Sequence, residues 1–135
     1  MNTVILRHIR NLLEATIGSY FELGADTGEN VSVLSNNFTD RIFISVDSDL
    51  NNYNTINSNI FNHANVLFYS MSAAEYNRTL TDAVALSYGI SVIFINHGAD
   101  YEDYAESVKI AQRLLGINPG HVVINQANAT PDIRS

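Results

Sequence analysis

Two glycines and an aspartate form the first candidate binding site in this sequence. The turn "GADTGEN" places Gly24 and Gly28 four residues apart, directly after an apolar run. Glycine lets the backbone turn tightly and approach a ligand without a Cβ in the way. Asp47 ends the next apolar run, 23 residues after Gly24, where its carboxylate can accept both hydroxyls of a ribose. The pattern indicates a nucleoside-binding turn, with a plain strand-to-helix turn and a helix-capping Asp47 as the alternatives.

Five apolar runs are expected to position these residues. They cover residues 19–25, 41–47, 65–70, 91–96 and 121–125. Their continuous hydrophobicity is typical of strands that are covered on both faces, as in parallel sheets. Amphipathic segments alternate with them, which predicts an α/β three-layer sandwich with a doubly wound, mostly parallel sheet in the order 3-2-1-4-5. We expect a single domain over residues 1–135, with its ligand at the carboxyl ends of the strands.

The helices between these strands carry their own start signals. Asp26 or Thr27 is predicted to cap the helix that follows the first strand. Ser72 and Glu75 have the spacing of a capping box. The helix that they begin is predicted to continue as one amphipathic segment, with an apolar face formed by Tyr76, Leu80 and Val84.

Composition argues against several functional classes. The net charge is −7, and the seven basic residues are scattered, so bulk binding to nucleic acid or to an anionic membrane is not expected. The chain has no cysteine, which excludes a disulfide framework and a thiolate nucleophile. No segment approaches the roughly 20 apolar residues that span a bilayer. The first residues do not have the pattern of a signal peptide, so the expected location is the cytoplasm.

Five stretches resemble, in order and spacing, the motifs of class I S-adenosylmethionine-dependent methyltransferases. They are "FELGADTGENV", "ISVDSD", "NVLFYSMSA", "VIFINHGADYED" and "LLGINPGHVVINQ". The resemblance covers roughly residues 18–126 and is to the branch whose fourth strand continues into an "IDG-x-H-x-Y" loop. It implies a Rossmann-like fold, S-adenosylmethionine as the cofactor and methyl transfer as the reaction.

The resemblance assigns roles to the residues around the first two strand ends. It implies that Glu22 and Gly24 flank the methionine moiety, with Gly28 in the turn beneath it. Asp47 is implied as the ligand of the ribose hydroxyls, and Ser48 is implied to lie beside the adenine.

Further roles fall after the third and fourth strands. The resemblance implies that Ser72 and Ala73 touch the adenine edge. Asn96 and His97 are implied to face the transferring methyl group, with Tyr101 in the covering loop. His97 is the candidate catalytic base because an imidazole titrates near neutral pH; a purely structural hydrogen bond within the loop is the alternative.

The sequence departs from the family at several polar positions. Asp26 replaces the middle glycine of the turn, which brings a side chain near the sulfonium and the carboxylate of the cofactor. Ser72, Asn96 and Gln126 replace acids that follow the third, fourth and fifth strands, and Ala99 replaces the loop histidine. Neutral amide oxygens are poor partners for magnesium, which prefers carboxylates. We therefore expect no metal and, if the protein is active, a metal-independent reaction.

The last predicted strand suggests a partner. In the family the sheet continues into an antiparallel hairpin, whereas only ten residues follow residues 121–125 here. That run contains no lysine, acid or proline, and such an edge invites pairing. A homo-oligomer or another partner along this edge is expected.

Two principal functions remain open from the sequence. One is a small methyltransferase with an unknown acceptor, and the other is a catalytically inactive binding or assembly module of the same fold. A nicotinamide dinucleotide site is a third possibility that the loop "NHGADYED" fits less well.

Overall fold

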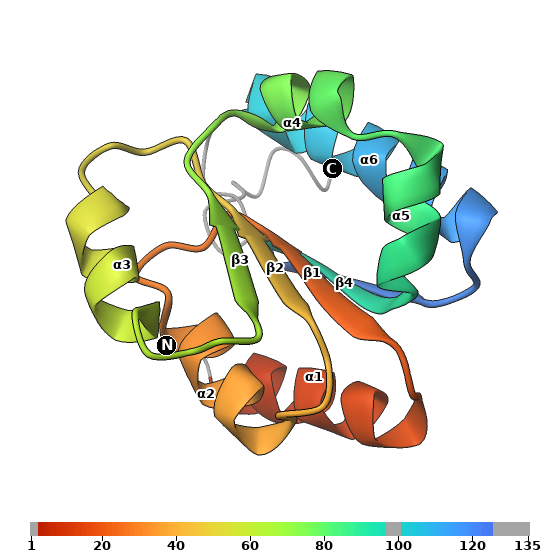
Figure 1. The fold of residues 1–135 in the computed structure, drawn as a ribbon. Coiled ribbons are helices and arrows are strands. Elements are labelled where there is room, and N and C mark those ends of the chain that lie inside the picture. Colours follow the sequence, from red (N-terminus) through yellow and green to blue (C-terminus); the bar gives the residue numbers. More distant parts are fainter. Residues whose placement is uncertain (1–2, 97–100, 126–135) are drawn as a thin grey trace, which may run out of the picture.

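A five-stranded sheet forms the centre of the computed structural model, which describes residues 3–96 and 101–125 (Figure 1). The strands are β1 (Ser19–Leu23), β2 (Phe43–Val46), β3 (Val66–Tyr69), β4 (Ile90–Asn96) and β5 (His121–Asn125). They pair in the order β3-β2-β1-β4-β5, and every pairing is parallel. The predicted α/β fold class, strand order and parallel sheet are therefore confirmed.

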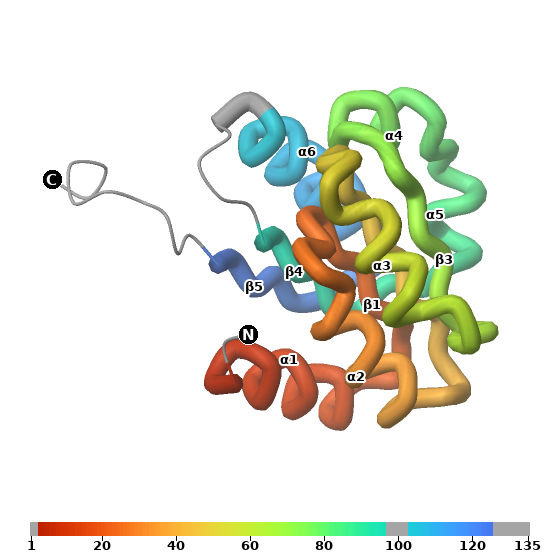
Figure 2. Tube along the Cα trace, turned by 90° about the vertical axis from the view of Figure 1, so that its left-hand side faces the viewer, coloured from red at the N-terminus to blue at the C-terminus, as the bar shows by residue number. Residues whose placement is uncertain are grey.

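Helices cover both faces of this sheet (Figure 1). One layer contains α1 (Thr3–Ala15), α2 (Glu29–Asn37) and α3 (Tyr53–Ile60). The other layer contains α4 (Ala73–Thr79), α5 (Asp82–Tyr88) and α6 (Tyr101–Ile117). Figure 2 shows the layers from the side, with α1 and α2 below the strands and α6 above them. In the described residues, no helix combines the length and the apolarity needed to cross a membrane.

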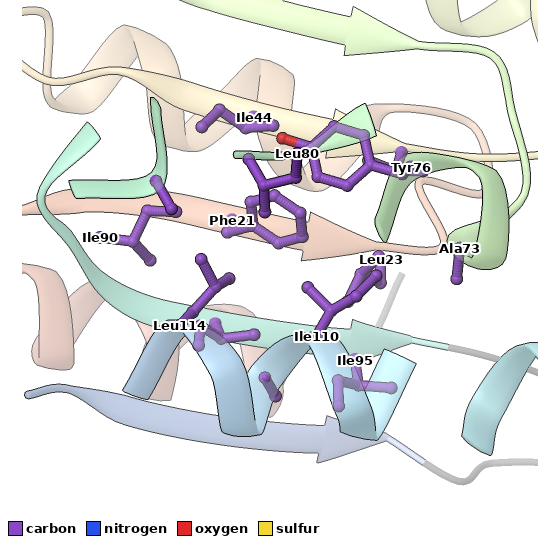
Figure 3. Close-up of a cluster of buried hydrophobic side chains, with 14 residues drawn as sticks. Phe21, Leu23, Ile44, Ala73, Tyr76, Leu80, Ile90, Ile95, Ile110 and Leu114 are labelled. Atoms are coloured by element: carbon purple, nitrogen blue, oxygen red, sulfur yellow. The ribbon is translucent and has the colours of Figure 1, made fainter. Parts of the chain in front are cut away.

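Strand β1 separates two hydrophobic cores because successive side chains of a strand point to opposite faces. Tyr20 is fully buried on the face covered by α1, α2 and α3. Phe21 and Leu23 belong to the core on the other face, where Figure 3 shows them among side chains such as Tyr76 and Ile110. The rings of Phe21 and Tyr76 lie 5.3 Å apart. Burial on both faces explains why the predicted strands read as continuous apolar runs.

The segment after β3 is two helices rather than the predicted single one. The capping box of Ser72 is present at the start of α4. Leu80 then adopts an extended conformation, and the hydroxyl of Thr81 accepts a hydrogen bond from the backbone N–H of Val84 to begin α5. Val84 is consequently 41% exposed and does not continue the apolar face. Arg113 of α6 stabilises this break, since its guanidinium donates to the carbonyl of Leu80.

The predicted cap of α2 is also wrong. The N-cap residue is Gly28, which has a left-handed conformation and makes no side-chain capping bond. Neither Asp26 nor Thr27 caps the helix; Asp26 and Gly28, two positions apart, both have a positive φ in the turn before α2 begins. This unusual turn lies at the candidate site.

Candidate functional site

The turn between β1 and α2 has a strained backbone. Gly24, Asp26 and Gly28 have φ values of 92°, 54° and 82°, in the region that L-residues avoid. A Cβ on Gly28 would lie 3.3 Å from the Cα of Ile56, so close packing against α3 also favours glycine there. Asp26 is the only residue other than glycine that has a positive φ in the described part of the chain. Backbone strain of this kind gathers at functional sites.

Asp47 holds this turn against the end of β2. Its Oδ2 accepts a hydrogen bond of 3.0 Å from the backbone N–H of Asp26, and its Oδ1 accepts one of 2.8 Å from that of Asp49. Burial raises the pKa of Asp47, while the backbone N–H groups of Asp49, Asp26 and Ala25 oppose the shift. A carboxylate offers about four lone-pair positions, so these two bonds leave room for further donors such as ribose hydroxyls. The role of Asp47 as a ligand of ribose hydroxyls stays a prediction.

Glu22 lies deeper, within β1, and is fully buried. Its two oxygens accept hydrogen bonds from the hydroxyl of Tyr20, at 2.8 Å, and from that of Ser45, at 2.7 Å. Burial raises the pKa of Glu22 to about 7; the two hydroxyl donors oppose the shift, and the charges of Asp47 and Asp26 add to it. Glu22 is thus engaged by the protein itself, and a direct contact with a ligand requires one of these bonds to open.

The partners of Glu22 were not predicted from the sequence. Tyr20 precedes it by two positions and shares its face of β1, and Ser45 is its register partner on β2. A serine inside the apolar run "RIFISVD" was the available signal, because a buried hydroxyl needs a hydrogen-bond partner.

Asn96, at the end of β4, belongs to a neutral network. Its Nδ2 donates to the carbonyl of Gly24 at 3.3 Å, and its Oδ1 accepts from Nδ2 of Asn125 at 2.9 Å. The amide therefore links the ends of β1, β4 and β5. Within the part of the chain that the structure describes, no group of three acidic, histidine or cysteine side chains is arranged to hold a metal ion.

The residues predicted at the adenine edge are not joined to Asp47 by the hydrogen bonds of the described residues. Ser48 is exposed in the loop after β2, and Ser72 caps α4. The backbone N–H of buried Ala73 donates to Oδ1 of Asp103 on α6, at 3.2 Å. No hydrogen bond between described residues joins Ser48, Ser72 or Ala73 to the Asp47 side chain. Asp103 was not anticipated from the sequence.

Several candidates fall outside what the structure describes. His97, Ala99 and Gln126 lie in the segments that are not described, and for Tyr101 only the backbone of α6 is described. The assignment of His97 as a catalytic base therefore stays a prediction.

A recess lies at the other edge of the sheet, where the strands begin. Its volume is about 580 Å³, and its lining includes Thr16, Ile17, Tyr88, Ser91 and Asn118. The lining contains hydroxyl, amide and apolar groups but no charged side chain. This recess was not predicted from the sequence, and it shares no residue with the turn at Gly24 or with Asp47.

Comparison with known proteins gives matches in structure alone. Neither a protein-family profile nor a curated protein matches the sequence. A candidate caffeoyl-CoA O-methyltransferase from Staphylococcus aureus superposes with a TM-score of 0.67 at 13% identity, covering 93% of this chain and 58% of the other. An O-methyltransferase family protein from Burkholderia thailandensis gives 0.61 at 14% identity, covering 97% and 41%. A chain of a fibrillarin–Nop5p complex gives 0.58 at 16% identity, covering 79% and 48%.

The fold is that of the class I S-adenosylmethionine-dependent methyltransferases. The resemblance noted in the sequence is therefore confirmed at the level of fold. The chain spans about half the length of these three structures. The turn at Gly24 and the end of β2 lie at the carboxyl ends of the strands, the edge where ligands of open α/β sheets bind.

Proposed function

We propose that the carboxyl ends of β1, β2 and β4 bind S-adenosylmethionine and that the protein transfers its methyl group without a metal. The observation that carries this proposal is the bond from the N–H of Asp26 to Oδ2 of Asp47. It joins a positive-φ turn to an acid that retains acceptor sites, at the edge where ligands of this fold bind. The methyltransferase fold of the three matched structures supports the choice of cofactor.

The residues around this turn have distinct proposed tasks. Asp47 accepts the ribose hydroxyls, while Gly24 and Gly28 keep the backbone free of side chains beneath the methionine moiety. Glu22 adds a partly protonated carboxyl group below the turn, since its pKa lies at about 7. The bound cofactor supplies an activated methyl group, so the protein has to bind, align and exclude water.

The proposed adenine contact at Ala73 requires an existing hydrogen bond to break. The N–H of Ala73 is already bonded to Asp103, so an adenine that uses this N–H has to displace the Asp103 carboxylate. Ser48 and Ser72 remain proposed neighbours of the base. Asn96 and His97 remain the proposed residues on the side of the transferring methyl group.

Metal independence is supported by the chemistry of Asn96. Its Oδ1 is neutral and already accepts a hydrogen bond from Asn125. Magnesium prefers charged oxygen ligands and keeps several waters. A proton removed from an acceptor therefore has to go to a side chain or to water rather than to a metal-bound hydroxide, and His97 is the proposed base.

Isothermal titration calorimetry with S-adenosylmethionine and S-adenosylhomocysteine tests the proposed site. We expect the Asp47→Ala variant to weaken binding by about 1–3 kcal/mol, because ribose hydroxyls lose their partner. Asp40→Ala is the matched control, since Asp40 is an exposed acid that precedes β2 at the opposite edge. Equal affinity of wild type and Asp47→Ala for both nucleosides would show that the ribose assignment is wrong. NAD⁺ serves as the third ligand, and tighter binding of NAD⁺ would favour a dinucleotide site.

A catalytically inactive binding or assembly module is the second candidate function. The neutral Asn96–Asn125 network favours it, because it stands where the family carries an acid. The two candidates differ in turnover: an enzyme converts S-adenosylmethionine to S-adenosylhomocysteine in the presence of a panel of hydroxyl and amine acceptors. Tight nucleoside binding without turnover over the whole panel is the expected result for the inactive module.

The cytoplasmic location stays a prediction.

We also propose that the protein self-associates along strand β5. In the described sheet β5 pairs with β4 alone, and it contains no acid, lysine or proline. Ile124 is 46% exposed, and such an edge tends to pair with another strand. A second copy related by a two-fold axis satisfies this edge with one interface. Light scattering at micromolar concentration should give a dimer mass, and Ile124→Lys should give a monomer; a monomeric wild type contradicts the proposal.

A further inference from the structure

Three helices end at the recess at the amino edge of the sheet. Helix α1 ends at Ala15, α5 at Tyr88 and α6 at Ile117, and the chain enters β1, β4 and β5 within a few residues of these ends (Figure 1). The recess has a volume of about 580 Å³ and is lined by residues from each of the three connections. That volume is in the range of pockets that hold small molecules. Because the recess shares no residue with the proposed nucleoside site, a molecule bound here would be a second ligand.

The helix ends give this recess a partial negative charge. The last four carbonyl groups of a helix have no partner within it, and the aligned peptide dipoles add about half a negative charge at the same end. None of the three helices has a basic residue in its last turn. Arg41 donates to the carbonyl of Leu13 in α1, but no hydrogen bond between described residues brings a basic side chain to the last turn of α5 or α6. The recess therefore favours a positively charged ligand.

The polar side chains of the lining keep acceptor sites. The hydroxyl of Thr16 donates to the carbonyl of Leu12 at 2.9 Å, so the hydroxyl of Ser91 is the donor in its bond of 3.0 Å to Thr16. Both protons are used inside the protein, whereas both oxygens keep lone pairs. The Nδ2 of Asn118 donates to the carbonyl of Ile90 at 2.7 Å, and its Oδ1 accepts no hydrogen bond from another described residue. The lining thus suits a ligand that donates hydrogen bonds.

Ser19 adds a nearly enclosed hydroxyl to the recess. It lines the recess at the start of β1 and is 6% exposed. Its backbone N–H donates to the carbonyl of Gly89 at 2.9 Å, but its hydroxyl makes no hydrogen bond with any other described residue. Such a group normally has a partner. The pairing of β1 with β4 is also irregular between Ser19 and Tyr20, and irregular pairing of this kind re-aims side chains. A ligand in the recess would supply the partner that Ser19 lacks.

We propose that this recess binds a small organic cation with a primary ammonium group on an alkyl chain. The ammonium group has three donors for the oxygens of Ser19, Ser91 and Asn118, and its charge lies at the ends of α5 and α6. The alkyl chain lies against the apolar part of the lining, which includes Ile17. A magnesium or calcium ion fits less well, because no carboxylate lines the recess. This site is independent of the proposed nucleoside site at the opposite edge.

Three probes with the same alkyl chain test the preference for positive charge. They are n-butylammonium, n-butanol and butyrate, added to the ¹⁵N-labelled protein at pH 7 and low ionic strength. We expect n-butylammonium to shift the amide signals of Gly18 and Gly89, which line the recess, with an affinity about tenfold higher than that of n-butanol. Butyrate should cause no saturable shift. The amides of Gly24 and Gly28 report on the opposite edge and should not follow the same titration.

Charge substitutions at Ile17 test the contribution of the helix ends. Ile17 lines the recess and is 97% exposed, so a charged side chain there leaves the core intact. Ile17→Lys should weaken the binding of n-butylammonium about fivefold, and Ile17→Glu should strengthen it by a similar factor. Val4→Lys and Val4→Glu are the matched controls, because Val4 is 69% exposed near the other end of α1. They should leave the affinity within about twofold of wild type.

The variant Ser19→Ala tests the hydrogen bonding of the ammonium group. It removes a hydroxyl that bonds to no described residue, so the fold keeps its bonds while n-butylammonium should bind about fivefold more weakly. Equal affinities of wild type for n-butylammonium and n-butanol would overturn the inference. So would equal affinities of Ile17→Lys and Ile17→Glu for the cation, or shifts confined to Gly24 and Gly28. None of these results would bear on the proposed function, because no probe is a nucleoside.

Discussion

The two edges of the sheet use polar residues in opposite ways. At the carboxyl edge, the turn from Gly24 to Gly28 is strained, and Asp26 and Asp47 bring charge to it. At the amino edge, Thr16 and Ser91 share a neutral hydrogen bond of 3.0 Å beside tightly packed glycines. The recess of about 580 Å³ lies at this second edge.

The difference shows that a recess among the described residues can be lined by neutral groups, while the strained turn and the buried acids lie at the other edge. The recess at the amino edge is lined by neutral groups, of which the hydroxyls of Thr16 and Ser91 are bonded to each other. The carboxyl edge combines backbone strain, a buried acid with a raised pKa and an acid with free acceptor sites. Perturbed acids and strained backbone gather at functional sites, which is why we place the function at the carboxyl edge.

The largest expected effect concerns packing at the amino edge. In the variant Gly18→Ala, the new Cβ would lie 2.3 Å from the carbonyl oxygen of Gly89 and 2.7 Å from the Cβ of Ser91. Because one neighbour is backbone, we expect a loss of about 3 kcal/mol or more in the free energy of unfolding. Urea denaturation measures it. Gly116→Ala is the control: a Cβ on Gly116 meets nothing within 4 Å, so this helical substitution should stabilise the protein slightly.

A slightly smaller effect is expected at the carboxyl edge, where Glu22 should make the free energy of unfolding depend on pH. The folded protein raises the pKa of Glu22 from 4.5 to about 7, so the folded state binds this proton more tightly than the unfolded state. The free energy of unfolding should therefore fall as the pH rises from about 4.5 to about 7, by about 3 kcal/mol when complete. Glu22→Gln should remove this loss, since its amide can still bond to Tyr20 and Ser45.

Denaturation of wild type and Glu22→Gln between pH 5 and pH 8.5 tests this dependence. Burial also raises the pKa of Asp47 and acts in the same direction, so the difference between the two proteins is the informative quantity. Glu14→Gln is the control, because Glu14 is exposed on α1. Parallel stability curves for wild type and Glu22→Gln would contradict the assigned role of burial.

The fold was predictable because hydrophobic runs report burial directly. Strands covered on both faces read as continuous apolar runs, and their alternation with amphipathic segments left few topologies. The break between α4 and α5 was not predictable from periodicity, because Tyr76 and Val84 keep helical spacing across it. It depends on the cap at Thr81 and on Arg113, which is 31 positions from its partner Asp82.

At the candidate site, the sequence indicated the unusual turn but not the contacts that its neighbours make. Glycine spacing and Asp47 pointed to the turn because they act through local backbone geometry. The bonds of Glu22 to Ser45 and of Asn96 to Asn125 depend on strand register. Register is set by packing over the whole sheet, and a motif in one segment carries no information about it.

The smallest expected effect tests whether a substitution at the amino edge changes ligand binding at the carboxyl edge. The hydroxyl of Thr16 donates to the carbonyl of Leu12 at 2.9 Å, so Ser91 acts as the donor in their shared bond. Thr16→Val keeps the shape and removes both bonds, which should lower the free energy of unfolding by about 1 kcal/mol. The affinity for S-adenosylmethionine should stay at the wild-type value, since Thr16 shares no bond with the turn at Gly24. Denaturation and calorimetry on the same sample measure both quantities. A loss of affinity as large as that of Asp47→Ala would show that strand β1 transmits changes from one edge to the other, and the two edges would then not be independent.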